Sequence, residues 1–341
     1  MSKSIAAGRL KLSLGNLESL PAMPEIARRL LMLPLDTESG EKQMIALVEK
    51  DPQISARVIG LANSSAMGSQ RQIKGIRDAA MLLGMQRLKS VALGIATMSA
   101  MLKQPAGKYF DPHDFWTHSM TIAIVMHAIA GAMPKRIRPD ENLIFLAGLL
   151  HDIGLAALHH LDYEASEELH HQMCLNPKAP IPEVETELLG VTHAEIGAQL
   201  VRHWNLPAEI ADVVGSHHSP PTGKEAYANP LIRLVSIAER LLPDFGFAEH
   251  TFGPVFDDEW RELCIDSTRV DEIVAIANEL ALQVVQLPEV QHETVQEVQA
   301  HEEALLEAAP KAQDTDLPVT RGRFAALLYA VKRIAASLKF W

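Results

Sequence analysis

The chain has 341 residues, of which 48% are hydrophobic and 22% are charged, a composition that supports a packed core and excludes a broadly disordered protein. It carries 31 Lys and Arg against 43 Asp and Glu, and the formal net charge of -12 argues against a protein that coats nucleic acid. The two cysteines, Cys174 and Cys264, lack a CxxC partner, so neither a disulfide framework nor a zinc ribbon is expected.

The sequence shows no signal for export or membrane insertion. Its first ten residues lack the long apolar stretch of a signal peptide. No uncharged apolar run approaches the roughly 18 residues expected of a membrane span. We therefore expect a cytoplasmic protein without a transmembrane segment. Its unusual feature is a total of 15 histidines, several of them clustered.

Nearly every periodic segment is typical of a helix. Leu, Ala, Ile, Met, Glu and Arg dominate, and β-branched residues rarely alternate with polar ones as a strand requires. Apolar residues recur at spacings of three or four between residues 43 and 61, but Asp51-Pro52 interrupts them. This predicts two helices, the second with Asp51 as its N-cap and Pro52 at its first position. Gly84 and Gly94 permit either a break or close packing farther along. The predicted fold class is all-α.

Composition divides the chain into four parts. Residues 1–13 are an N-terminal tail, residues 14–110 form a helical block, and residues 111–250 carry nearly all the clustered histidines. Residues 251–341 form a helical extension with an acidic linker and a basic, amphipathic last helix. The last helix, at residues 321–341, is predicted either to dock on its own protein or to meet an anionic membrane or an acidic partner.

Two polar features of the N-terminal block have ordinary structural readings. Asn63 and Ser64 are predicted to end a helix by hydrogen-bonding to the backbone. The basic residues between positions 71 and 89 have no aromatic residues among them for base stacking, which favours a solvated face over a nucleic-acid site. Binding of nucleic acid is therefore not expected.

The most informative residues are imidazoles and carboxylates near the ends of apolar helices: His118, His151, Asp152, His193, His217, His218 and Glu239. Without a thiolate, such a set suits Fe, Mn, Zn or Ni. His151 and Asp152 end the apolar stretch 143–150, where an unpaired buried carboxylate would be costly, and Gly154 is predicted to terminate this helix. Because adjacent helical residues point about 100° apart, the His-Asp and His-His pairs can face different sides of one cavity or hold two ions.

The order of these ligands resembles a known family. His118, His151-Asp152 and a later acid match the H…HD…D pattern of the HD superfamily of metal-dependent phosphohydrolases. The other histidines resemble the extra ligands of dinuclear members such as the HD-GYP phosphodiesterases. The N-terminal block resembles an HDOD domain, the HD-related output domain of bacterial signalling, in five motifs: Leu20-Pro-Ala-Met-Pro24, Asp51-Pro-Gln-Ile-Ser-Ala-Arg-Val58, Leu61-Ala-Asn-Ser-Ser65, Ile73-Lys-Gly-Ile76 and Ala79-Ala-Met-Leu-Leu-Gly84.

The resemblance implies an HD-like core of several helices at residues 111–250, packed against the N-terminal helical subdomain. It also implies one or two divalent ions. In a two-ion arrangement Asp152 would bridge the ions and act as the catalytic carboxylate. His118, His151 and Glu239 would hold one ion, and His193, His217 and His218 would hold the other.

Two departures bear on catalysis. The phosphodiesterase motif continues His-Asp-Ile-Gly-Lys, but Leu155 stands at the lysine position, and the GYP segment after the double histidine is missing. Two functions therefore stay open. One is a signalling output module that binds metal and contacts a protein partner. The other is a metal-dependent phosphohydrolase of a nucleotide or cyclic dinucleotide, with Lys224, Arg233 and Arg240 as candidate phosphate-binding residues.

Overall fold

The computed structural model describes residues 20–64, 67–68, 71–221, 228–241 and 254–285. Within these ranges the secondary structure is helical and contains no strand, which confirms the all-α prediction. The chain divides into two compact units, Met1–Pro288 and Glu289–Trp341, and all described residues belong to the first. The predicted tail at 1–13, the acidic linker and the basic last helix lie outside the described residues, and the finer domain boundaries stay predictions.

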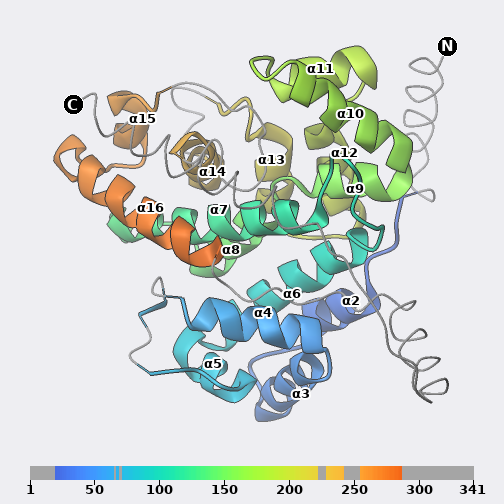
Figure 1. Cartoon of the computed structure of the whole chain (residues 1–341). Helices are drawn as coiled ribbons and strands as arrows, with labels where there is room; N and C mark the ends of the chain where they lie inside the picture. Colours follow the sequence, from blue (N-terminus) through green and yellow to red (C-terminus); the bar gives the residue numbers. More distant parts are fainter. Residues whose placement is uncertain (1–19, 65–66, 69–70, 222–227, 242–253, 286–341) are drawn as a thin grey trace, which may run out of the picture. The chain divides into compact units, whose positions relative to one another are not determined.

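The N-terminal helices form a group in the lower part of Figure 1, and α6 is the member of this group that packs against α8. These helices are α2 (Glu25–Met32), α3 (Glu38–Glu49), α4 (Pro52–Ala62), α5 (Ile76–Leu83) and α6 (Met85–Met101). The predicted break before α4 is confirmed, because the Asp51 carboxylate accepts the N–H groups of Gln53 and Ile54, both at 3.0 Å. Gly84 separates α5 from α6 with a φ of 81°, a conformation that favours glycine.

The predicted roles of Asn63 and Ser64 are also confirmed. The Asn63 side-chain amide donates to the carbonyl of Ile59 at 3.0 Å and to that of Ile73 at 2.8 Å, and its oxygen accepts the N–H of Ile73 at 2.7 Å. Ser64 donates its hydroxyl to the carbonyl of Leu61 at 2.7 Å. Both residues therefore close the end of α4 and fix the chain that leads to α5.

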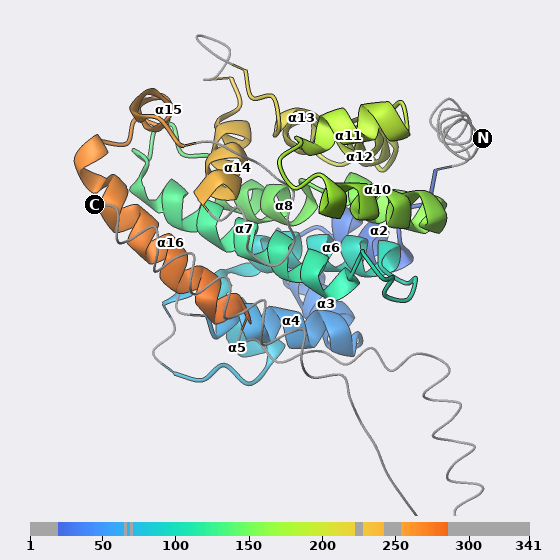
Figure 2. The same ribbon diagram turned by 45° about the horizontal axis from the view of Figure 1, so that its top comes forward.

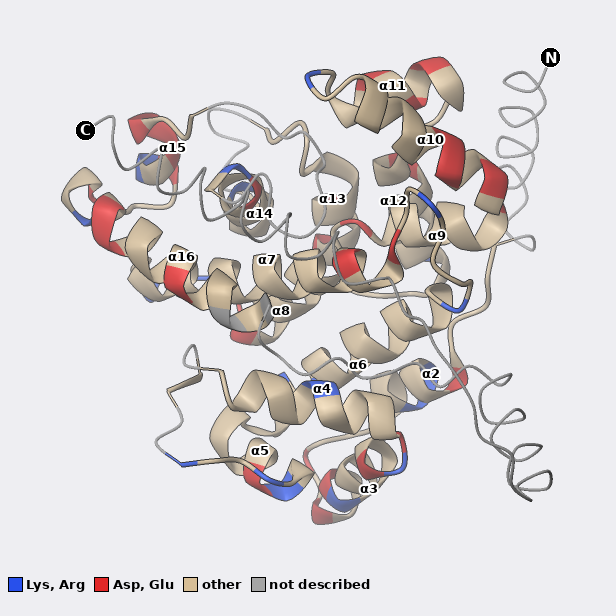
Figure 3. Cartoon of the chain, in the orientation of Figure 1, with Lys and Arg blue, Asp and Glu red and all other residues tan. Residues whose placement is uncertain are grey.

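Apolar helices form the centre of the unit and carry the histidines. They are α7 (Pro112–Ala132), α8 (Glu141–Leu150), α9 (Ile153–Leu161), α12 (His193–His203), α13 (Ala208–Ser216) and α14 (Pro230–Leu241). Figure 3 shows α9 free of Lys, Arg, Asp and Glu, and the one acid of α8 stands in its first turn. Gly94 and Gly148 allow close packing of these helices. A Cβ atom on Gly94 would lie 2.7 Å from the Leu149 side chain, and one on Gly148 would lie 2.4 Å from the Cα atom of Ala123.

Gly154 does not terminate a helix, contrary to the sequence prediction. Helix α8 ends at Leu150, His151 is its C-cap, and Asp152 is the N-cap of α9, so the break falls at the His-Asp pair. Gly154 lies inside α9, where a Cβ atom would stand 1.9 Å from the His193 carbonyl oxygen. The glycine serves to bring α9 against the start of α12.

The remaining helices cover this centre. They are α10 (Tyr163–Leu175), α11 (Ile181–Leu188), α15 (Asp257–Glu262), the short 3₁₀ helix η4 (Ser267–Arg269) and α16 (Val270–Val285). Helix α16 packs along α7, as Figure 2 shows. Helices α14 and α15 are joined by ion pairs of the buried Arg233 with the partly buried Glu259 at 2.7 Å and Glu262 at 2.6 Å.

Two described segments, Pro112–Ala132 and Glu141–Leu161, are long and apolar enough by composition to cross a membrane, although the sequence analysis expected no run of that kind. Their most apolar windows are 78% and 89% buried inside the fold. Both segments are core helices of this unit, so packing accounts for their apolar character.

Candidate metal centre

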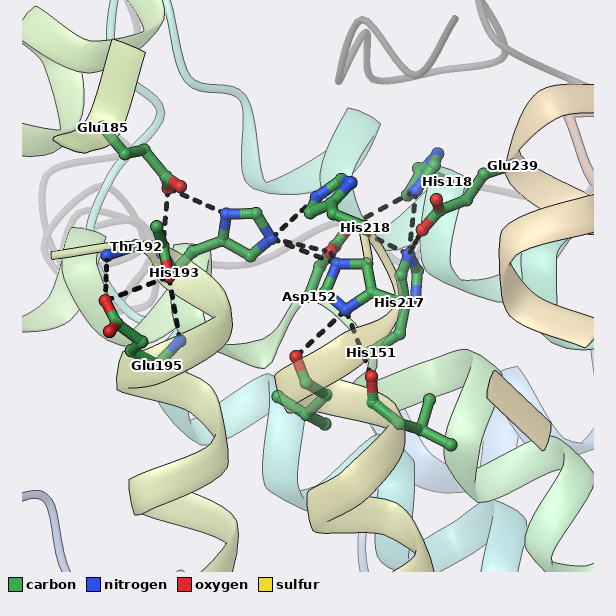
Figure 4. Close-up of polar contacts among 12 residues, drawn as sticks. His118, His151, Asp152, Glu185, Thr192, His193, Glu195, His217, His218 and Glu239 are labelled. Atoms are coloured by element: carbon green, nitrogen blue, oxygen red, sulfur yellow. Dashed lines mark hydrogen bonds and ion pairs between the residues drawn. The ribbon is translucent and has the colours of Figure 1, made fainter. Parts of the chain in front are cut away.

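The seven predicted ligands converge on one place in the fold, although five different helices or helix ends supply them (Figure 4). His118 lies in α7, and His151 and Asp152 lie between α8 and α9. His193 is the first residue of α12, His217 and His218 follow α13, and Glu239 lies in α14. His118, His151, Asp152, His193, His217 and Glu239 are at most 4% exposed, and His218 is half-buried. The residues singled out by their types and by the resemblance to the HD superfamily are therefore neighbours in space.

The start of α12 is fixed by a capping box. The Thr192 hydroxyl accepts the N–H of Glu195 at 3.2 Å, and the Glu195 carboxylate accepts the N–H of Thr192 at 2.8 Å. This pattern is a common helix-start signal in sequence. It places His193 at the first helical position, where its side chain turns toward Asp152.

One half of the cluster gathers at the Oδ2 atom of Asp152. This oxygen lies 2.9 Å from Nε2 of His151 and 3.4 Å from Nε2 of His118. The two histidine nitrogens are 3.2 Å apart. Glu239 approaches from α14, with its Oε1 atom 3.3 Å from Nε2 of His151.

The other half gathers at the Oδ1 atom of Asp152. This oxygen lies 3.2 Å from Nε2 of His217 and 3.5 Å from Nε2 of His193. Nε2 of His193 is in turn 3.2 Å from Nε2 of His217 and 3.1 Å from Nε2 of His218. The carboxylate of Asp152 thus faces one group of ligand atoms with each of its oxygens.

Main-chain contacts on the far side of two rings determine which nitrogen faces the cluster. Nδ1 of His151 lies 2.8 Å from the carbonyl oxygen of Gly148, and Nδ1 of His217 lies 3.0 Å from that of Val214. Because a carbonyl oxygen only accepts, each Nδ1 carries a proton, and in the neutral form of each ring the free lone pair is on Nε2. These Nε2 atoms are therefore available as metal ligands.

His193 has a different partner, which the sequence analysis missed. Its Nδ1 atom lies 2.8 Å from Oε1 of Glu185, a fully buried residue in α11. Glu183, Glu185 and Glu187 alternate along the same short helix, and no local pattern marks one of them. Only the packing of α11 against the start of α12 distinguishes Glu185.

The electrostatics of the cluster favour a cation. Burial is the largest effect on the pKa of His151 and lowers it, but the Asp152 and Glu239 carboxylates together outweigh burial and raise this pKa to about 9. Burial lowers the pKa of His193 too, and Glu185 with Asp152 raises it overall. Within the described residues, neither oxygen of the buried Glu239 has a hydrogen-bond partner. The residues fit a divalent ion, and the buried cluster could bind metal.

The predicted phosphate-binding residues are either paired with carboxylates or outside the described residues. Lys224 is outside them. Arg233 is paired with Glu259 and Glu262, and Arg240 donates to Oε2 of Glu259 at 3.0 Å. A phosphate would have to compete with these carboxylates, so the phosphate-binding role of the two arginines stays a prediction.

The model of the HDOD domain family matches residues 20–220, more than half of the chain. The chain belongs to the HDOD domain family. Six of the seven clustered residues lie within the matched part, and Glu239 lies beyond it. The resemblance deduced from the N-terminal motifs is therefore confirmed.

Solved structures share the fold of this HDOD protein. A protein of Marinobacter aquaeolei, provisionally described as a signal transduction protein, has a TM-score of 0.64 and 24% identity, covering 84% of this chain and 65% of its own. An HDOD domain protein of Geobacter sulfurreducens has a TM-score of 0.60 and 23% identity, covering 80% and 98%. A Shewanella amazonensis protein, provisionally described as a metal-dependent phosphohydrolase, has a TM-score of 0.57 and 18% identity, covering 83% and 100%.

Curated relatives match over shorter stretches. An uncharacterized protein of Treponema pallidum is 24% identical over 239 residues, which are 67% of this chain and 44% of the relative. Ribonuclease Y of Deinococcus radiodurans is 23% identical over 139 residues, or 41% of this chain and 19% of that enzyme. The HDOD chain thus spans less than half the length of either relative.

Proposed function

We propose that this HDOD protein is a signal-transduction output module that binds one or two divalent metal ions and acts through protein–protein contacts. The observation that carries the proposal is the buried set of imidazoles around Asp152, whose two oxygens face separate groups of ligand atoms. Such a set is costly to bury without a compensating cation. The metal would therefore stabilise the fold that a partner recognises, since binding to the folded state alone raises stability.

In this proposal His118, His151 and Glu239 would hold one ion, and His193, His217 and His218 would hold the other. Asp152 would serve both positions, because each of its oxygens faces one of the two groups. When bound, ions so arranged would supply Lewis-acid polarisation of a phosphate oxygen or of water. The protein's own contribution is to hold the rings of His151, His193 and His217 through their Nδ1 atoms, with Nε2 toward the cluster, and to exclude water from the carboxylates of Asp152 and Glu239.

Three features favour a module over a hydrolase. Leu155 is fully buried and cannot bind a phosphate as a lysine at this position would. Arg233 and Arg240 are engaged by Glu259. Six of the seven ligands are at most 4% exposed, which leaves mainly the side of His218 for contact with solvent.

A metal-dependent phosphohydrolase acting on a nucleotide or cyclic dinucleotide is the second candidate. It is supported by the carboxylate between two ligand groups, which is the arrangement that two-metal phosphoryl chemistry uses. In that case Asp152 would be the catalytic carboxylate. Both candidate functions predict that the protein binds metal. Only the hydrolase predicts that it also hydrolyses a phosphodiester.

The test is metal content, measured by mass spectrometry on protein purified without a metal-binding tag. We expect one or two equivalents in the wild type and at least one fewer in His118→Ala. The matched control, His113→Ala, removes an exposed histidine from the same helix and should keep the wild-type content. Absence of metal from the wild type would refute the proposal.

The same samples separate the two candidates. The wild type is assayed against a generic phosphodiester and cyclic di-GMP, with the double variant His151→Ala/Asp152→Ala as the negative control. A module binds metal without turnover. Turnover that disappears in the double variant would establish the hydrolase instead.

A further inference from the structure

The acceptors of the Nδ1 protons differ around the cluster. His151 and His217 donate to main-chain carbonyl groups, whereas His193 donates to the carboxylate of Glu185 at 2.8 Å. The same oxygen of Glu185 also accepts the main-chain N–H of His193, at 3.0 Å. One buried carboxylate therefore fixes both the ring and the backbone of this ligand, as Figure 4 shows.

The two ligand groups also differ in charge. The first has a carboxylate of its own, because Glu239 lies 3.3 Å from Nε2 of His151. The second consists of three imidazoles and shares Asp152 with the first. A divalent ion in the second group would thus meet less negative charge among its direct ligands than an ion in the first.

Glu185 supplies a negative charge to the second group indirectly, through its contact with the His193 ring. It is 0% exposed, and its second oxygen, Oε2, has no hydrogen-bond partner within the described part of the chain. A buried carboxylate in this state needs positive charge nearby. Through Nδ1 of His193 it makes the opposite nitrogen, Nε2, a more basic ligand.

We propose that Glu185 is a positioning residue that sets the affinity of the second metal position through His193. Each ion then has one carboxylate to itself: Glu239 acts on the first directly, and Glu185 acts on the second through the imidazole ring. The inference rests on the proposed two-ion site. Loss of a partner of this kind typically lowers metal affinity about 10- to 100-fold.

Glu185→Gln tests the inference because glutamine keeps the shape and the accepting oxygen but removes the charge. The metal-free full chain is titrated with Mn²⁺, and free Mn²⁺ is counted by its EPR signal. We expect the variant to lose about 10-fold or more in affinity at one position and to keep the wild-type affinity at the other.

Two further variants make the result specific. Glu195→Gln removes one negative charge from the first turn of α12, the helix that begins with His193, but preserves the capping box, and it should titrate as the wild type. Glu239→Gln should weaken the other position, so that the double variant Glu185→Gln/Glu239→Gln loses affinity at both. Thermal unfolding of the metal-free variants reports any purely structural effect of each change.

The outcomes are distinct. Equal Mn²⁺ affinities in the wild type and in Glu185→Gln overturn the inference and leave the proposed function standing. The same holds if Glu185→Gln lowers only the melting temperature of the metal-free protein. A wild type that binds no Mn²⁺ overturns both the inference and the proposed function.

Discussion

Residues of one type take opposite properties in this fold because their neighbours differ. Burial lowers the pKa of His170 to about 4, although Ser166 accepts its Nδ1 proton at 2.7 Å. His151 is just as buried, yet two carboxylates beside it raise its pKa to about 9. Burial alone therefore does not mark a ligand; the carboxylates of Asp152 and Glu239 distinguish His151 from the equally buried His170.

The pKa of His170 predicts a loss of stability in acid. The unfolded chain takes up a proton at this side chain near pH 6.5, whereas the folded chain does so only near pH 4. The stability contributed by the neutral ring is therefore complete above pH 6.5 and falls as the pH drops toward 4. For one fully buried ring the loss is roughly 1–3 kcal/mol.

We expect His170→Gln to reduce this dependence, because its amide still donates to Ser166 but does not titrate. Urea unfolding of the metal-free protein between pH 7 and pH 4, with a chelator present, measures the effect. His171→Gln controls for removal of a histidine from the same helix. An equally steep fall in His170→Gln would show that His170 does not contribute to the acid sensitivity.

At the scale of elements, the close approach of α9 to α12 brings the two halves of the cluster together. Gly154 in α9 and Gly197 in α12 face each other, and a Cβ on Gly197 would lie 3.0 Å from the Gly154 nitrogen. Asp152 immediately precedes α9, and His193 begins α12. A larger side chain at this contact would push Asp152 away from His193 and the second ligand group.

We expect Gly154→Ala to destabilise the protein by about 3 kcal/mol, because the added methyl group meets backbone atoms of α12 that cannot rotate away. The matched control is Gly131→Ala in α7, where an added Cβ has no heavy atom within 4 Å. Its effect should stay within about 1 kcal/mol, in either direction. Urea unfolding measures both, and similar values would contradict the close packing of α9 and α12.

At the scale of the whole molecule, the cluster belongs to a unit longer than the family match. Glu239 lies beyond residue 220, in α14, and ion pairs of the buried Arg233 with Glu259 and Glu262 join α14 to α15. The unit that contains these residues ends at Pro288. The residues after the HDOD match therefore complete the candidate metal site.

This organisation predicts that a chain shortened to residues 1–288 retains the metal content of the full chain, because every clustered residue lies within the first unit. Mass spectrometry of the two purified proteins compares their metal equivalents. Glu239→Gln in the shortened chain serves as the control that should lower them. A loss of metal on shortening alone would show that residues 289–341 take part in the site.

From the sequence alone, apolar periodicity and capping residues predicted the helical class and the break at Asp51-Pro52. The family was recognised from motifs that resemble the HDOD and HD families, and the seven candidate ligands from that resemblance and from their residue types near helix ends. The predicted role of Gly154 is wrong. A glycine after an apolar helix is a common stop signal, but here the glycine lies inside α9 and allows α9 to pack closely on α12.

The arrangement of the cluster could not be predicted from the sequence. It depends on contacts between helices that are distant in the sequence. These contacts direct the two Asp152 oxygens to separate groups, place Glu185 beside His193, and pair Arg233 and Arg240 with Glu259. One glutamate in an acidic helix resembles the next until packing buries it against a particular ring. The physical reason is that burial and neighbouring charge, which set ligand strength, are properties of the assembled fold and not of a local pattern.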